Sequence, residues 1–217
     1  MKKYILFSLF IIFIFVAFNK TILSKIIVFS LSKWVERDFL VKEVNINYSA
    51  KEIVFNFVEI RNEDKFFYNN IFEIDKIQLK YDLSTFLTDL VKVDYLFFEN
   101  IKFFLEFDEM DEKIVDDNIG LAIKNKKNYE PKIYPKKRKD KNFLVKKTEL
   151  INSKVFIKSL GNDKEIKVNL SNMSFFKISN KSEFNHYKNI FKIILNDIFF
   201  KVPDQKMKNL IKKTYKF

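Results

Sequence analysis

Alternation of apolar and polar residues with a period of two dominates the body of this 217-residue chain. The run Val44-Asn-Ile-Asn-Tyr48 is one example, and Ile77-Gln-Leu-Lys-Tyr81 is another. Successive side chains of a β-strand point to opposite faces of a sheet, so this period indicates strands that are buried on one face. The same alternation occurs at 53–57, 91–97 and 101–107 and again after residue 142. These runs predict a mostly antiparallel sheet.

Three features interrupt the alternation and predict connections or helices. Glu99-Asn100 separates two alternating runs, which predicts a hairpin there. Asp82 precedes apolar residues spaced i, i+3, i+4 and i+7, so a short helix is expected over 83–90. After Ser182 a broad apolar stripe continues until Pro203, which predicts an amphipathic helix near the C-terminus.

The composition divides the chain into four parts. Residues 1–38 are the expected transmembrane anchor and juxtamembrane helix, and 39–107 form an N-terminal β-rich part. Residues 108–142, acidic at first and then basic, are expected to be a charged linker or mobile loop. Residues 143–217 are expected to add strands and a helix to the same sheet domain. The predicted class is α+β: an N-terminal transmembrane helix, then a mostly antiparallel, curved sheet with a short inserted helix and a C-terminal amphipathic helix.

The N-terminus predicts attachment to a membrane. Met1-Lys2-Lys3 precedes an uncharged run from Tyr4 to Phe18, which is the arrangement of an export signal. Extension through Leu23 reaches the roughly 20 residues that span a bilayer, and no small-x-small cleavage site follows. We expect an uncleaved single-pass anchor, with a cleaved signal peptide as the alternative. The candidate membrane-interface residues are Tyr4, Lys20 and Trp34.

The anchor also predicts a location. A short basic segment before such a run is normally retained on the cytoplasmic side, and a long domain after it crosses the membrane largely regardless of its charge. The count of positive charges does not fix the topology. For a bacterial protein, we expect the inner membrane, with the main domain in the periplasm. The stretch 22–36 is expected to continue as a helix that either lies at the membrane interface or packs on the domain.

The sequence holds no catalytic motif. Glycine occurs only at positions 120 and 161, so no phosphate-binding loop, dinucleotide fingerprint or nucleophile elbow can form. The chain has no cysteine and a single histidine, His186, and its acidic run 108–117 lacks the spacing of an EF-hand loop. We therefore expect no enzyme, no cofactor and no metal site.

The net charge of +12 raises the question of nucleic-acid binding. Lysines occur in every segment, and the abundance of Lys, Asn, Ile and Phe fits an AT-rich genome. Because basic character is only the electrostatic part of the case for nucleic-acid binding, we expect no nucleic-acid partner.

Several stretches, taken in order, carry a family resemblance. They are the N-terminal run, Phe39–Tyr48, Ile53–Phe57, Ile60–Asn62 and Ile74–Leu90, followed by Val93–Glu106, Glu149–Phe156 and Ile166–Ile178. Together they resemble the AsmA-like family, and the resemblance covers most of the chain outside 108–142. It implies an inner-membrane anchor, a β-rich, taco-like periplasmic fold and a role in outer-membrane homeostasis or phospholipid movement. It brings no catalytic residues.

The resemblance suggests phospholipid and other envelope proteins as partners. Under it, a set of strand residues is expected to line an apolar, lipid-binding concave face, although an ordinary core under a helix is the alternative for them. These residues are Ile53, Phe55, Phe57, Ile77, Leu79, Tyr81, Val93, Tyr95, Phe97, Ile101, Phe103 and Leu105. The alternative function is a structural or assembly partner that docks a membrane complex through a sheet edge or the 182–202 helix.

Overall fold

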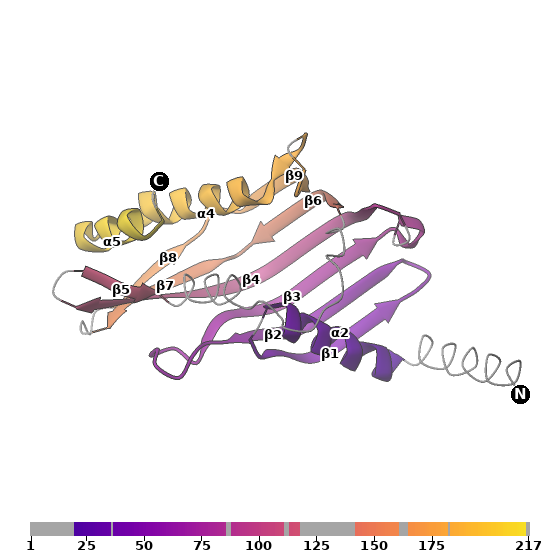
Figure 1. Cartoon of the computed structure of the whole chain (residues 1–217), viewed down its shortest axis with the longest axis horizontal. Helices are drawn as coiled ribbons and strands as arrows, with labels where there is room; N and C mark the ends of the chain where they lie inside the picture. The colour runs from indigo at the N-terminus through magenta and orange to yellow at the C-terminus, as the bar shows by residue number, and fades with distance from the viewer. Residues whose placement is uncertain are drawn as a thin grey trace, which may run out of the picture.

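The computed structural model describes residues 20–35, 37–85, 88–110, 113–117, 142–160, 165–181 and 183–215. In these residues ten strands form one mixed sheet, and three α-helices pack on it (Figure 1). The helices are α2 (Lys20–Val35), α4 (Tyr187–Lys201) and α5 (Gln205–Tyr215). The sheet therefore carries the fold, and the helices cover parts of one face.

The N-terminal half of the sheet is an antiparallel meander. Its strands are β1 (Phe39–Asn47), β2 (Glu52–Arg61), β3 (Asn70–Tyr81) and β4 (Leu90–Met110). Each strand pairs with the next, and β5 (Lys113–Asp117) folds back on the end of β4.

The C-terminal half adds strands to the other edge of β4. They are β6 (Asn142–Ile151), β7 (Lys154–Leu160), β8 (Glu165–Asn169), β9 (Met173–Ser179) and β10 (Asn185–His186). Strands β6 and β7 both run parallel to β4, whereas β8 pairs with β7 and β9 with β6 in the antiparallel sense. One uninterrupted register joins β4 to β6 and β7, because Leu90 lies opposite Asn142 and Asp108 lies opposite Leu160.

The predicted α+β class is wrong in several respects. Most strand pairings in the described residues are antiparallel, but the sheet is mixed, because β4 runs parallel to both β6 and β7. The hairpin predicted at Glu99-Asn100 does not form, since β4 continues through it as one strand of 21 residues. The helix predicted over 83–90 is reduced to a 3-10 turn, η1 (Leu83–Thr85), because β4 already begins at Leu90.

The predicted membrane anchor is also corrected. Residues 1–19, with the interface candidate Tyr4, lie outside the described residues, as do the side chains of Lys20 and Trp34. In the part of the chain that the structure describes, no helix has the length and apolar character needed to cross a membrane. The transmembrane helix in the predicted fold class, and the single-pass inner-membrane location with a periplasmic domain that rested on it, are therefore contradicted. Helix α2 packs on the sheet through Ile27, Val28 and Leu31.

All three α-helices lie on the same side of the sheet, which we call face A. Phe55, Val58 and Ile74 form a buried cluster on this face beneath α2. A larger cluster beneath α4 and α5 brings strand residues such as Leu105 and Ile157 against helix residues such as Ile211. Since burial of each large aliphatic side chain stabilises the fold by about 1.5–3 kcal/mol, these clusters fix the helices to the sheet.

Face A stays apolar because the alternation of side chains between the two faces shifts by one residue along a line that crosses the strands. In β2, β3 and β4, two core residues lie three positions apart instead of two: Phe55 and Val58, Ile74 and Ile77, and Phe98 and Ile101. A residue in regular β conformation alternates sides, so this spacing requires one residue outside that conformation. We call the row at this line the crease. It consists of Lys42, Phe57, Asp75, Asn100 and Asn152, each of which lies between consecutive partner pairs of the strand register.

Left-handed backbone marks the crease directly. Phe57, Asn100 and Asn152 each have a φ of 54°. Asparagine tolerates this region better than most residues, and Asn100 also donates a hydrogen bond of 2.9 Å from Nδ2 to Oδ2 of Asp75. A second, shorter crease passes through Asp94, Lys146 and Lys177, where Lys177 has a φ of 55° and Lys146 forms an ion pair of 2.6 Å with Asp94.

Substitution at the crease tests its backbone requirement. Asn152 is exposed, so Asn152→Gly should keep the stability of the protein, whereas Asn152→Val should lower the free energy of unfolding by about 1–2 kcal/mol relative to Gly. Urea denaturation measures this difference. Asn169, an exposed position in the regular strand β8, is the control, where valine should be at least as stable as glycine. The same order at both positions would contradict the role of the crease.

Candidate functional site

An apolar strip crosses face A between α2 and α4. Phe98 and Ile101 of β4 pack against both the cluster beneath α2 and a third cluster around Val145 and Phe175. Phe98 and Ile101 thus connect the cluster beneath α2 with the cluster against which α4 packs. Figure 1 shows α2 lying along β1 and β2 at one edge of the sheet, with α4 near the opposite edge.

Rows of residues in register make up the floor of this strip. Phe55, Ile77 and Phe98 are successive partners across β2, β3 and β4, and Ile53, Leu79 and Leu96 form the next row. Apart from Phe55, these side chains are only partly buried. At the far side, Ile190 and Ile194 of α4 pack on the third cluster. The strip therefore offers a continuous apolar surface between two helices.

Most of the predicted lipid-face residues lie on face A, but they do not share one environment. Phe103 and Leu105 are deeply buried beneath α4 and α5, so they belong to the core. Tyr81 is buried at the end of β3, and burial raises the pKa of its hydroxyl. The residues that lie in or beside the strip are Ile53, Phe55, Ile77, Leu79, Val93 and Ile101.

Three of the predicted residues lie on the opposite face, which we call face B. Phe57 is 56% exposed there, with Nζ of Lys42 5.0 Å from its ring centre. Tyr95 and Phe97 stack at 6.1 Å, and the Tyr95 hydroxyl donates to the Glu149 carboxylate. Burial and this hydrogen bond raise the pKa of Tyr95 to about 12. The creases explain the misplacement. A strict period of two places Phe57, Tyr95 and Phe97 on the apolar face, but the alternation shifts by one residue at each crease.

A buried carboxylate on face B was not recognised from the sequence. Glu106 is fully buried and fixes the loop between β2 and β3 by accepting three hydrogen bonds. The donors are the backbone N–H groups of Phe67 at 2.7 Å and Tyr68 at 2.9 Å, and Nδ2 of Asn62 at 3.3 Å. Burial raises the pKa of Glu106, although the backbone donors act against that rise. A glutamate inside the apolar run Phe103–Phe107 was the available signal.

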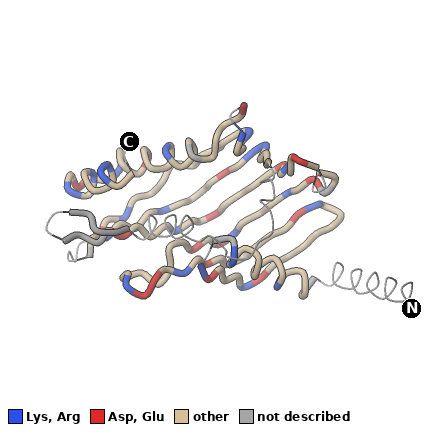
Figure 2. The backbone as a smooth tube through the Cα atoms, in the orientation of Figure 1, with Lys and Arg blue, Asp and Glu red and all other residues tan. Residues whose placement is uncertain are grey.

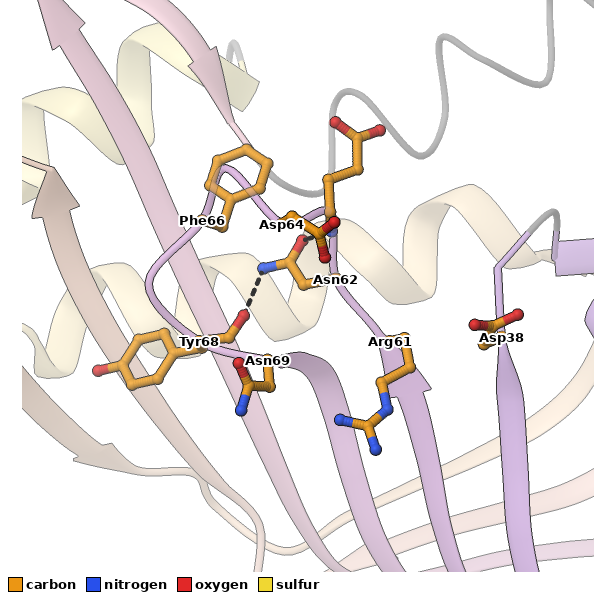
Figure 3. Close-up of a pocket in the computed structure, with 8 residues that line it drawn as sticks. Asp38, Arg61, Asn62, Asp64, Phe66, Tyr68 and Asn69 are labelled. Carbon is orange, nitrogen blue, oxygen red and sulfur yellow. Dashed lines mark hydrogen bonds between the residues drawn. The ribbon is translucent and has the colours of Figure 1, made fainter.

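A polar cavity of about 340 Å³ lies beside this loop. Arg61 lines it from β2, and Asp38 and Asp64 line it from the connections (Figure 3). Asn62 is held in place by donating to the carbonyl oxygen of Tyr68 at 3.2 Å, and Arg37 pairs with Glu63 at 2.8 Å. Because Asn62 and Glu63 are engaged in these bonds within or beside the loop, the cavity is better explained as support for the loop than as a reactive site. Within the described residues, no three His, Cys, Asp or Glu side chains are placed to hold a metal ion.

Two buried polar atoms in the described residues have no hydrogen-bond partner: Oδ1 of Asn70 and Oγ1 of Thr148. Thr148 lies opposite Leu96 and Phe175, in the row that floors the strip. An apolar group of the same shape would remove the cost of desolvating its hydroxyl.

Replacement of Thr148 tests this cost. Thr148→Val should raise the free energy of unfolding by about 1 kcal/mol. Thr85 is the matched control, because its buried hydroxyl donates to the Asp82 carbonyl at 2.8 Å and accepts from the Lys92 N–H at 2.9 Å. Thr85→Val should therefore lower stability in the same urea titration. A loss of stability in both variants would show that the Thr148 hydroxyl is bonded.

The raised pKa of Glu106 predicts a pH dependence. A raised pKa means that the folded protein binds this proton more readily than the unfolded chain, so the stability contributed by protonated Glu106 is lost as pH rises above about 4.5. The free energy of unfolding of the wild type, minus that of Glu106→Gln, should therefore fall as pH rises above 4.5. Glu149→Gln is the control: hydrogen bonding from Tyr95 lowers the pKa of Glu149, so its difference should rise with pH below 4.5. A flat difference for Glu106 would contradict the assignment.

No protein-family model matches this chain, and a search of curated proteins found no match. The resemblance to the AsmA-like family therefore remains a prediction from the sequence.

Proposed function

We propose that this protein binds the acyl chain of a lipid along the apolar strip on face A. The observation that carries the proposal is the continuity of the strip, in which Phe98 and Ile101 join the cluster under α2 to the cluster under α4. The strip crosses β2, β3, β4 and β6, which corresponds to about 14 Å at the usual strand spacing. It can thus hold an extended chain along a row of side chains.

Hydrophobic burial supplies the binding energy for such a ligand. Each methylene group removed from water contributes about 0.8 kcal/mol, so an acyl chain gains binding free energy with every methylene group that contacts the strip. The partly exposed side chains of Ile77, Leu96 and Phe98 have apolar surface left to bury. The proposal keeps the lipid ligand and the non-enzymatic role that the AsmA-like resemblance implies, without its membrane anchor.

Lipid extraction tests the proposal on the protein as purified. The full chain is isolated under gentle conditions, extracted with organic solvent and analysed by mass spectrometry. We expect a lipid with at least one long acyl chain in near-stoichiometric amount. A preparation with no bound lipid but with a stoichiometric protein partner would favour the alternative role in assembly and count against lipid binding.

A pair of adjacent phenylalanines provides a matched variant and control. Phe98 lies in the strip, whereas Phe97 lies on face B with Nζ of Lys76 5.9 Å from its ring centre. Phe98→Ser should weaken binding of a short-chain phospholipid at least five-fold, because about 1–3 kcal/mol of apolar contact is lost. Phe97→Ser should change the affinity less than two-fold. Isothermal titration calorimetry below the micelle concentration measures both, and equal losses would place the ligand elsewhere.

A further inference from the structure

Within the residues that the structure describes, the net positive charge is concentrated on the three helices of face A. Helices α2, α4 and α5 together contain ten lysines and a single acidic residue, Asp197, so they carry a net charge of +9. The whole chain has a net charge of +12. Figure 2 shows basic positions along α4 and α5 at one side of the sheet. Lysines occur in every segment of the sequence, but in the helices almost no acidic residue balances their charge.

Helix α5 separates its apolar and basic residues cleanly. Met207, Leu210 and Ile211 are buried against the sheet, whereas Lys206, Lys212 and Lys213 are exposed. Two acidic residues of this surface are already engaged. Asp197 pairs with Lys201 at 3.0 Å and accepts the Ser171 N–H at 2.9 Å, and Asp204 caps α5 by accepting the Met207 N–H at 3.0 Å. Because α5 itself contains no acidic residue, its outer lysines make the exposed side of this helix basic.

Large apolar side chains protrude between these charges. Phe200 of α4 is 77% exposed and Phe29 of α2 is 60% exposed, and both helices turn their opposite sides to the sheet. Ile193 lies two turns before Phe200 on the same side of α4 and is 48% exposed. In α2, Nζ of Lys33 lies 4.5 Å from the ring centre of Phe29, which places a charge next to an apolar tip.

Face B has a different character. Its lysines are interleaved with glutamates, and several form ion pairs, such as Lys102 with Glu73 at 3.0 Å and Lys147 with Glu149 at 3.0 Å. Opposite charges in such pairs cancel at a distance, so this face has little attraction for an anionic surface. The two sides of the sheet therefore differ in what they can bind.

We propose that the outer side of α2, α4 and α5, the helical surface, docks on a bilayer that contains anionic lipids. Helices bind such a surface when lysines contact the headgroups and isolated aromatic or aliphatic side chains enter the boundary with the acyl chains. The helical surface combines both features in helices that are held on one side of a rigid sheet. A nucleic acid would be attracted by the lysines but would gain nothing from aliphatic tips such as Ile193. This proposal does not rest on lipid binding in the strip, and each can fail without the other.

Vesicle sedimentation tests the docking with the full chain. The probes are vesicles of phosphatidylcholine with and without 30% phosphatidylglycerol, a fraction of about one third chosen to give a charged surface. Replacement of Lys206, Lys208, Lys212 and Lys213 by Gln should lower partition to the anionic vesicles at least ten-fold. The matched control removes the same number of charges from strand positions, at Lys42, Lys80, Lys154 and Lys167, and should lower partition less than three-fold. Circular dichroism shows that each variant remains folded.

A second pair of variants tests the apolar contribution. Phe29→Ser with Phe200→Ser should lower partition at least five-fold, whereas Phe67→Ser with Phe176→Ser, which are 61% and 55% exposed elsewhere, should have little effect. Equal losses in the two lysine variants would overturn the proposal, because net charge alone would then explain binding. Unchanged partition in both helix variants would also overturn it. So would binding of a duplex oligonucleotide that depends on the α5 lysines when the anionic vesicles do not bind.

Discussion

The pairing of β4 along both of its edges is the interaction on which the rest of this structure depends. One edge of this strand holds β3 and, through it, the N-terminal meander, and the other edge holds β6 and β7 in a single parallel register. Every apolar cluster of the described residues contains or contacts side chains of β4. If this strand lost its register, the two halves of the sheet would separate, and the strip between α2 and α4 would no longer exist.

The creases allow such a long strand to remain apolar on one side. Without them, Phe98 and Ile101 would lie on opposite faces, and face A would be interrupted by charged residues in the middle of the sheet. The cost is left-handed backbone at three positions of the first crease, one of which is a phenylalanine. Phe57 has no side-chain property that favours this conformation, so the neighbouring strands must hold it there through their hydrogen bonds.

Much of the strand content could be predicted from the sequence, but its arrangement could not. Alternation in runs such as 53–57 and 77–81 reports local burial, and these runs lie in β2 and β3. The parallel pairing of β4 with β6 joins distant segments and leaves no local pattern. Left-handed residues such as Asn100 were indistinguishable from turn residues, which produced a false hairpin and placed Tyr95 and Phe97 on the wrong face. Likewise, the net positive charge of face A emerges only when the three helices are brought together.

The C-terminal helices have a consequence for how the chain reaches this fold. The cluster beneath them joins Phe103 of the central strand to Ile211, almost at the end of the sequence. During synthesis from the N-terminus, the apolar side of β4 and β7 stays uncovered until α4 and α5 have been made. Contacts so distant in sequence form slowly. Until they form, the apolar side chains of β4 and β7 are exposed to other chains. The protein is therefore most prone to aggregate before α5 packs on the sheet.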